Sequence, residues 1–159
     1  MVISALAVFL FVSGAAEVSE VGVQRTPGKP MQFFEDHRPA EEIVARKDGE
    51  KLVLCVRVNV PREGVKKYSE ETAALTPKEW ESILEIVGRE KLLDWKPDPK
   101  GERVFDWGSS GLRVKSEKEN AHIWTEPLKN GEGPAALSKR LSSLAAEKVK
   151  SLKLYYLAP

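Results

Sequence analysis

The stretch from Lys51 to Val60 restricts the fold more than any other part of the chain, because its apolar residues occupy every second position. The alternating residues are Leu52, Leu54, Val56, Val58 and Val60. A period of two is typical of a strand with one face against a core and the other toward solvent. The stretch therefore predicts a half-buried strand.

Further strands are predicted on both sides of this one. Asp48-Gly49 separates it from an earlier strand-like run, and Asp-Gly is a strong hairpin signal because both residues tolerate positive φ. Short sequence separations between such runs favour antiparallel neighbours, so we expect a meander. The expected strands are residues 18–25, 42–47 and 65–73, with a second turn at Pro61-Arg62-Glu63-Gly64.

The first helix has the clearest predicted boundary in the sequence. Thr76 is followed by Pro77 and, three residues on, by Glu79, which is the pattern of a capping box. The residues that follow at helical spacing form one apolar stripe. They are Trp80, Ile83, Leu84 and Val87. Gly88 is the expected terminator, and the alternative is that Leu92, Leu93 and Trp95 extend the helix or begin a packed loop.

The C-terminal half predicts a second hairpin and a second helix. Residues 111–116 and 121–126 read as strands around a polar turn, and an apolar stripe at Leu137, Leu141, Leu144 and Ala145 reads as a helix. Residues 152–157 are expected to form a short edge strand or a docked tail. The predicted fold class is α+β, an antiparallel sheet built from hairpins with two helices packed on one face.

Composition excludes several classes of protein. With 42% apolar residues and 25 Lys and Arg against 24 Asp and Glu, the chain is not of the disordered type, and a net charge of +1 gives no basis for nucleic-acid binding. One cysteine excludes an internal disulfide framework. On the strand period, Cys55 lies on the less apolar side, and we interpret it as a small apolar residue partly covered by a neighbouring element. An intermolecular disulfide is the alternative.

The N-terminal residues predict export. Residues 2–12 read VISALAVFLFV, and small residues follow as Ser13-Gly14-Ala15-Ala16. This apolar run is too short to span a ~30 Å hydrocarbon core but has the length of a signal-peptide core. We expect cleavage after Ala16, or after Ala15, so that residues 1–16 are a secretory signal and residues 17–159 form a single domain. The chain would then be periplasmic or extracellular and would meet a membrane only transiently.

One element of such a signal is missing, because no Lys or Arg precedes the apolar run. The alternative interpretation is that residues 1–16 form a buried N-terminal strand or helix of the domain.

Catalytic patterns are weak. His37 and His122 are the only histidines, and neither lies in a local hydrolase motif. Gly108-Ser109-Ser110-Gly111 lacks the order of a nucleophile elbow and is interpreted as a flexible turn. Glu35 and His37 offer two metal ligands where a catalytic zinc needs three, so a solvated acidic loop is the preferred interpretation. We predict no catalytic residues, no metal ligands and no cofactor.

Tryptophans are the remaining signal of function. Trp80 belongs to the helix stripe and is expected in the core. Trp95, Trp107 and Trp124 flank or follow a long irregular segment, and exposed tryptophans are favoured where a surface binds a partner. They are the candidate ligand or partner surface. The alternative is that they fold over the open end of the sheet.

Together these features predict a small exported domain that acts without catalysis, as a binding or inhibitory protein whose partner is a protein or small molecule outside the cytoplasm. One alternative is a hydrolase that uses His37 or His122 with a carboxylate. Another is a structural component of the cell envelope that associates through an exposed edge strand.

The predicted signal is testable by intact-mass measurement of the exported protein. We expect the mass of a chain that begins at Glu17, or at Ala16 if cleavage follows Ala15, because small residues at these positions fit signal peptidase. An exported chain that still begins at Met1 would contradict the prediction.

Overall fold

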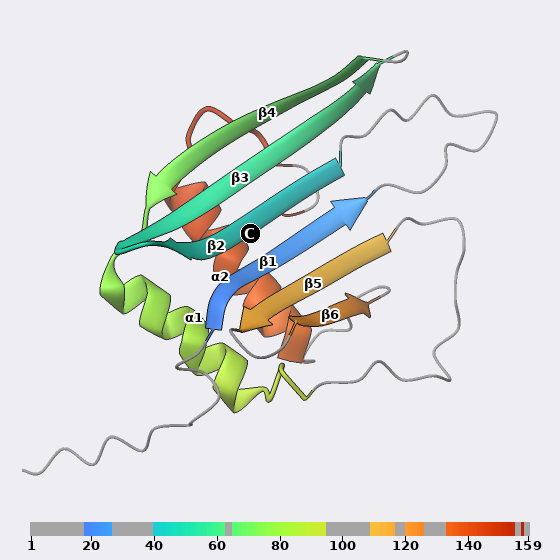
Figure 1. Ribbon diagram of the computed structural model, residues 1–159. Coiled ribbons are helices and arrows are strands. Elements are labelled where there is room, and N and C mark those ends of the chain that lie inside the picture. Colours follow the sequence, from blue (N-terminus) through green and yellow to red (C-terminus); the bar gives the residue numbers. More distant parts are fainter. Residues whose placement is uncertain are drawn as a thin grey trace, which may run out of the picture.

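In the computed structural model, six strands form one antiparallel sheet in the order β4-β3-β2-β1-β5-β6, with two helices (Figure 1). The structure describes residues 18–26, 40–62, 65–94, 109–116, 120–125, 133–154 and 157. The elements are β1 (Val18–Thr26), β2 (Ala40–Asp48), β3 (Lys51–Arg62), β4 (Val65–Ala74), α1 (Pro77–Arg89), β5 (Ser109–Ser116), β6 (Asn120–Thr125) and α2 (Gly133–Lys148). The predicted α+β class is confirmed.

The sheet combines a meander with a separate hairpin. Strands β1 to β4 pair in chain order, and β5 returns to pair with β1, so β1 lies between β2 and β5. The predicted β2–β3 hairpin is confirmed, with its turn one residue later than expected. Asp48 pairs with Lys51, so the turn residues are Gly49 and Glu50, and Gly49 takes the positive φ of 62°.

Two predicted turns belong to strands instead. Pro61 and Arg62 continue β3 and pair with Lys66 and Val65 of β4, so the bend between these strands comes later than predicted. Ser109 to Gly111, interpreted as a flexible turn, form the start of β5 because their backbone pairs with the last residues of β1. In both segments, pairing with a neighbouring strand outweighs the local preference of the residues for a turn.

Both helices contribute to one core against one face of the sheet. Helix α2 packs on β1 and β2 and passes behind them in Figure 1, while α1 packs beside α2. The predicted helix stripes are buried, including Trp80 at 4% exposed, except that Leu84 is only partly buried. The deepest core side chains include Ile43, Leu54, Ile83, Leu112, Leu137, Leu141 and Leu144. Neither described helix is long and apolar enough to cross a membrane.

Helix α1 has defined signals at both ends. The capping box is present: Glu79 N donates to Thr76 Oγ1 at 3.3 Å, and Thr76 N donates to Glu79 Oε2 at 2.7 Å. Gly88 is not the terminator, because α1 continues to Arg89 and the left-handed residue is Lys91, with φ of 50°. The alternative of a packed segment after the helix is confirmed for Leu92 and Leu93. Leu92 N donates to Val87 O and Lys91 N donates to Gly88 O, the bonds of a Schellman motif, which turns Leu92 into the core.

Polar contacts join the two helices where their surfaces meet. Lys148 Nζ lies 2.9 Å from Glu79 Oε1, and Arg140 Nε donates to Ser82 Oγ at 3.0 Å. Glu79 thus serves both the cap of α1 and the contact with α2. The start of α1 and the end of α2 are held together at this residue.

The C-terminal segment is a docked tail, and the edge-strand alternative is wrong. Residues 149–154 form no strand, and Leu152 and Leu154 pack partly buried against the core. Leu157 is 8% exposed, and its N–H donates at 2.8 Å to Oε2 of Glu41, a β2 carboxylate only 1% exposed. A charge-assisted bond of this kind offsets part of the cost of burying a carboxyl group.

The cap of α1 is testable by substitution. Thr76→Ala removes the side-chain acceptor for the Glu79 N–H, and we expect the free energy of unfolding in urea to fall by about 1 kcal/mol. Thr76→Ser keeps a hydroxyl and is the matched control, with a loss of only a few tenths of that value. Equal losses in the two variants would show that the hydroxyl does not stabilise the helix.

Candidate functional site

The face of the sheet opposite the helices is the candidate site, and we call it the open face. Within the described part of the chain, Figure 1 shows no helix over it. The strand period sends the apolar residues to the helices, so the alternate positions of β1, β2, β3, β4 and β5 belong to the open face. Its described side chains are mostly polar, as the sequence predicted for the side of β3 that carries Cys55.

Strand register arranges these positions in three parallel rows across the sheet. The first runs Trp124, Gly111, Gln24, Glu42, Arg57 and Glu70. The second runs His122, Arg113, Gly22, Val44, Cys55 and Thr72. The third runs Asn120, Lys115, Glu20, Arg46, Val53 and Ala74.

Two arginines and three glutamates form a network over these rows. Arg57 donates from Nε to Glu70 at 2.5 Å and from Nη1 to Glu42 at 2.9 Å. Arg113 donates from Nε to Glu20 at 2.7 Å, and its Nη1 lies 3.6 Å from the second oxygen of Glu42. Glu42 therefore lies between two guanidinium groups from strands on opposite sides of β2.

The network shifts the ionisation of its members. The hydrogen bond from Arg57 holds the pKa of the Glu70 carboxyl below its usual value, and the same bond raises the pKa of Arg57. Both groups are thus charged across the neutral pH range. Each pair is partly exposed, so the arrangement orients these side chains more than it stabilises the fold.

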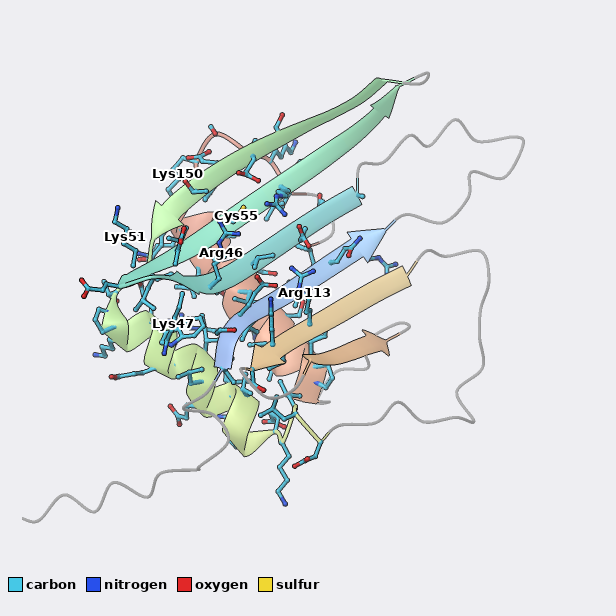
Figure 2. The ribbon with its side chains drawn as sticks, in the orientation of Figure 1. Arg46, Lys47, Lys51, Cys55, Arg113 and Lys150 are labelled. Carbon is cyan, nitrogen blue, oxygen red and sulfur yellow. The ribbon has the colours of Figure 1, made fainter. Side chains whose placement is uncertain are left out.

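Between β1 and β5 the open face has a shallow hollow with room for about one water-sized group. It is lined by residues that include Gly22, Gln24, Glu42, Gly111 and Arg113. A methyl group on Gly22 would lie 3.3 Å from Val44 Cγ2 and 3.7 Å from Arg113 Nη2. The first distance is tighter than usual and the second is an ordinary van der Waals contact, so the missing side chain makes room chiefly for Val44, with Arg113 beside it (Arg113 is labelled in Figure 2).

Of the three predicted tryptophans, one is placed by the structure. The backbone of Trp124 in β6 is paired with Gly111, so Trp124 occupies the open-face position next to the hollow. Trp95 and Trp107 lie outside the described residues. The register thus connects one member of the predicted surface with a concave part of the sheet.

The residues weighed for catalysis are not brought together in the described part of the chain. His122 is paired in β6 with Arg113, while Glu35 and His37 lie outside the described residues. Among the described residues, no group of three or more His, Cys, Asp and Glu is arranged to hold a metal ion.

Sequence reasoning missed Gly22, Glu42 and Arg113 as site residues. Gly22 interrupts a predicted strand at a polar position, and a glycine inside a strand marks a close approach. The sequence therefore contained a signal at Gly22, but it did not show which residue lies next to this glycine. Gly22 and Arg113 are far apart in the chain and meet only through the pairing of β1 with β5.

Cys55 is 2% exposed on the open face, beside Arg57, Arg46 and Glu70. Burial raises the pKa of its thiol. Both properties disfavour the thiolate that would attack another chain's disulfide, and so they oppose an intermolecular disulfide of the folded protein.

We therefore expect the Cys55 thiol of the native protein to react with iodoacetamide at pH 8 at least about tenfold more slowly than the same thiol in 8 M urea, because attack needs an exposed thiolate. Mass spectrometry of the alkylated protein measures both rates. Rapid native labelling, or a dimer on non-reducing electrophoresis that reductant removes, would contradict the prediction.

Comparison with known proteins gives no relative: no protein-family model matches the chain, and no curated protein matches it significantly. The open face with its hollow is accordingly defined by strand register and side-chain geometry.

Proposed function

We propose that this chain is an exported, non-catalytic binding protein that recognises its partner through the open face of the sheet. The observation that carries the proposal is the hollow between β1 and β5, lined by Gln24, Glu42 and Arg113 and adjoined by the position of Trp124.

The open face has the features of a recognition surface. It combines oriented charges, in the network of Arg57, Arg113 and their glutamates, with a concave region where two strands carry glycine. Arginine and tryptophan are the residue types most enriched at the energetically important positions of interfaces. Concavity gives a partner group more contact area than a flat sheet offers.

Export is supported by the N-terminal sequence, where an uncharged apolar run is followed by small residues. The first described strand begins at Val18, so cleavage after Ala16 would remove none of the described elements. A binding role outside the cytoplasm is consistent with both observations.

The proposal is tested by photo-crosslinking from the hollow. p-Benzoylphenylalanine replaces Gln24, and in a matched protein it replaces Glu85, an exposed residue of α1 on the helix side. In the exported fraction of the native cells we expect a specific protein adduct from position 24 and none from position 85. Native mass spectrometry of the protein recovered from that fraction detects a small-molecule ligand instead.

A second pair of variants locates the adduct or the bound ligand. Gly111→Val fills the hollow with a residue that strands tolerate well, and we expect it to abolish binding. Thr72→Val changes the same face outside the hollow and should leave binding unchanged. Binding that survives Gly111→Val, adducts that form equally from both faces, or the absence of both adduct and ligand would contradict the proposal.

A further inference from the structure

We propose that the hollow binds an acidic side chain of a protein partner, with Arg113 as the residue that receives the carboxylate. This inference rests on the proposed binding function and specifies the chemistry of its partner. Three observations carry it: the donors that Arg113 leaves unused, the space beside them, and the charge balance of the open face.

Arg113 has N–H groups that its neighbours do not engage. Its Nε is bonded to Glu20, but Nη1 lies 3.6 Å from Glu42, too far for a hydrogen bond. Among the described residues, Nη2 has no hydrogen-bond partner. The Nη pair of an arginine is suited to two parallel bonds with one carboxylate.

Glu42 stays at a distance from Arg113 because its other oxygen is bound by Arg57 at 2.9 Å. Arg57 in turn has both Nε and Nη1 engaged, by Glu70 and Glu42. Arg57 thus has hydrogen bonds from two of its three nitrogens to described residues, whereas Arg113 has one from Nε alone, so Arg113 has the larger donor capacity for a partner. Its side chain is 37% exposed, so a partner reaches it without rearrangement of the sheet.

The hollow beside these donors is partly open to solvent and has room for about one water-sized group, so a carboxylate oxygen fits there while the rest of the partner's side chain stays outside. Gly22 and Gly111 belong to adjacent strands on the open face, and both line the hollow together with Arg113. A methyl group on Gly22 would lie 3.7 Å from Arg113 Nη2, on the side of the hollow. The two glycines keep this hollow open in the middle of a sheet, where glycine is otherwise unfavourable.

The charges of the open face favour one negative group. Its described side chains include the cations Arg46, Arg57, Arg113 and Lys115 and the anions Glu20, Glu42 and Glu70. Lys51 and Asp48 occupy the same face where β2 and β3 meet, so its described side chains carry five cations and four anions, and a single carboxylate balances these described charges. A doubly charged phosphate would be repelled more strongly by Glu42, and a basic side chain would add to the excess.

The test compares two peptides that differ only in charge. The full chain, labelled with ¹⁵N, is titrated with acetyl-Gly-Glu-Gly-amide and with acetyl-Gly-Gln-Gly-amide at constant ionic strength. We expect saturable shifts of the Gly22 and Gly111 amide signals with the Glu peptide, and an affinity roughly tenfold lower for the Gln peptide.

Three variants assign the effect to Arg113. Arg113→Gln should abolish the preference for the Glu peptide, and Arg113→Lys should retain part of it because the charge remains but the paired donors do not. Lys139→Gln removes the same charge from an exposed position of α2, on the helix side of the sheet, and should change the affinity by less than about twofold. Circular dichroism verifies that each variant is folded.

The outcomes separate this inference from the proposed function. Equal affinity for both peptides overturns the carboxylate site. So does a Glu preference that persists in Arg113→Gln or is lost equally in Lys139→Gln. If the adduct that forms from position 24 is nevertheless lost in Gly111→Val, the open face still binds a partner, and that partner has a different chemistry. If neither adduct nor bound ligand is found while the Glu peptide binds more tightly than the Gln peptide, the hollow selects carboxylates but the proposed function is wrong.

Discussion

Burial of one apolar sheet face is the interaction on which the rest of the structure depends. Alternate residues of β1, β2, β3 and β5 place side chains such as Val21, Ile43, Leu54 and Leu112 against the helices, almost without exposure. Each fully buried aliphatic side chain of this size contributes about 2 kcal/mol. The helices supply the matching stripes, and the ion pair of Glu79 with Lys148 fixes how they lie against each other.

The same alternation determines what the open face can be. A position that does not face the helices must be polar, or it must be covered by its neighbours. Val44 and Cys55 are 3% and 2% exposed even though they lie on the open face. Long charged side chains shield apolar groups with their stems while their ends remain in water. The arginines of this face therefore protect the sheet and at the same time present charge.

Local sequence patterns were sufficient for most elements and for the fold class. The alternation in β3, the capping box of α1 and the Asp48-Gly49 hairpin each depend on residues a few positions apart. These features can therefore be predicted from the sequence alone. The stop of α1 was misplaced because Lys91 adopts the left-handed conformation that normally selects glycine, while the burial of Leu92 favours that turn. The end of α1 was thus determined by the burial of Leu92 in the tertiary structure, which a rule based on neighbouring residues does not take into account.

The candidate site was predicted only in part, for a related reason. Trp124 was singled out by residue type, but its neighbours Gly111 and Gln24 became visible only once β1, β5 and β6 were paired. Arg113 and Glu42 had the appearance of ordinary surface charges along their own strands. Their role follows from the strand order. It places β5 next to β1, although β2, β3, β4 and α1 lie between these two strands in the sequence.

The bond between Glu41 and Leu157 has a consequence for the order of folding. Its two residues are 116 positions apart, whereas the β2–β3 hairpin closes over a few residues. The tail contact therefore costs more loop-closure entropy, and we expect it to form after the hairpin. Until the tail arrives, the Glu41 carboxyl lacks the Leu157 donor. Docking of the tail therefore adds one charge-assisted hydrogen bond to a core whose strands and helices are already in place.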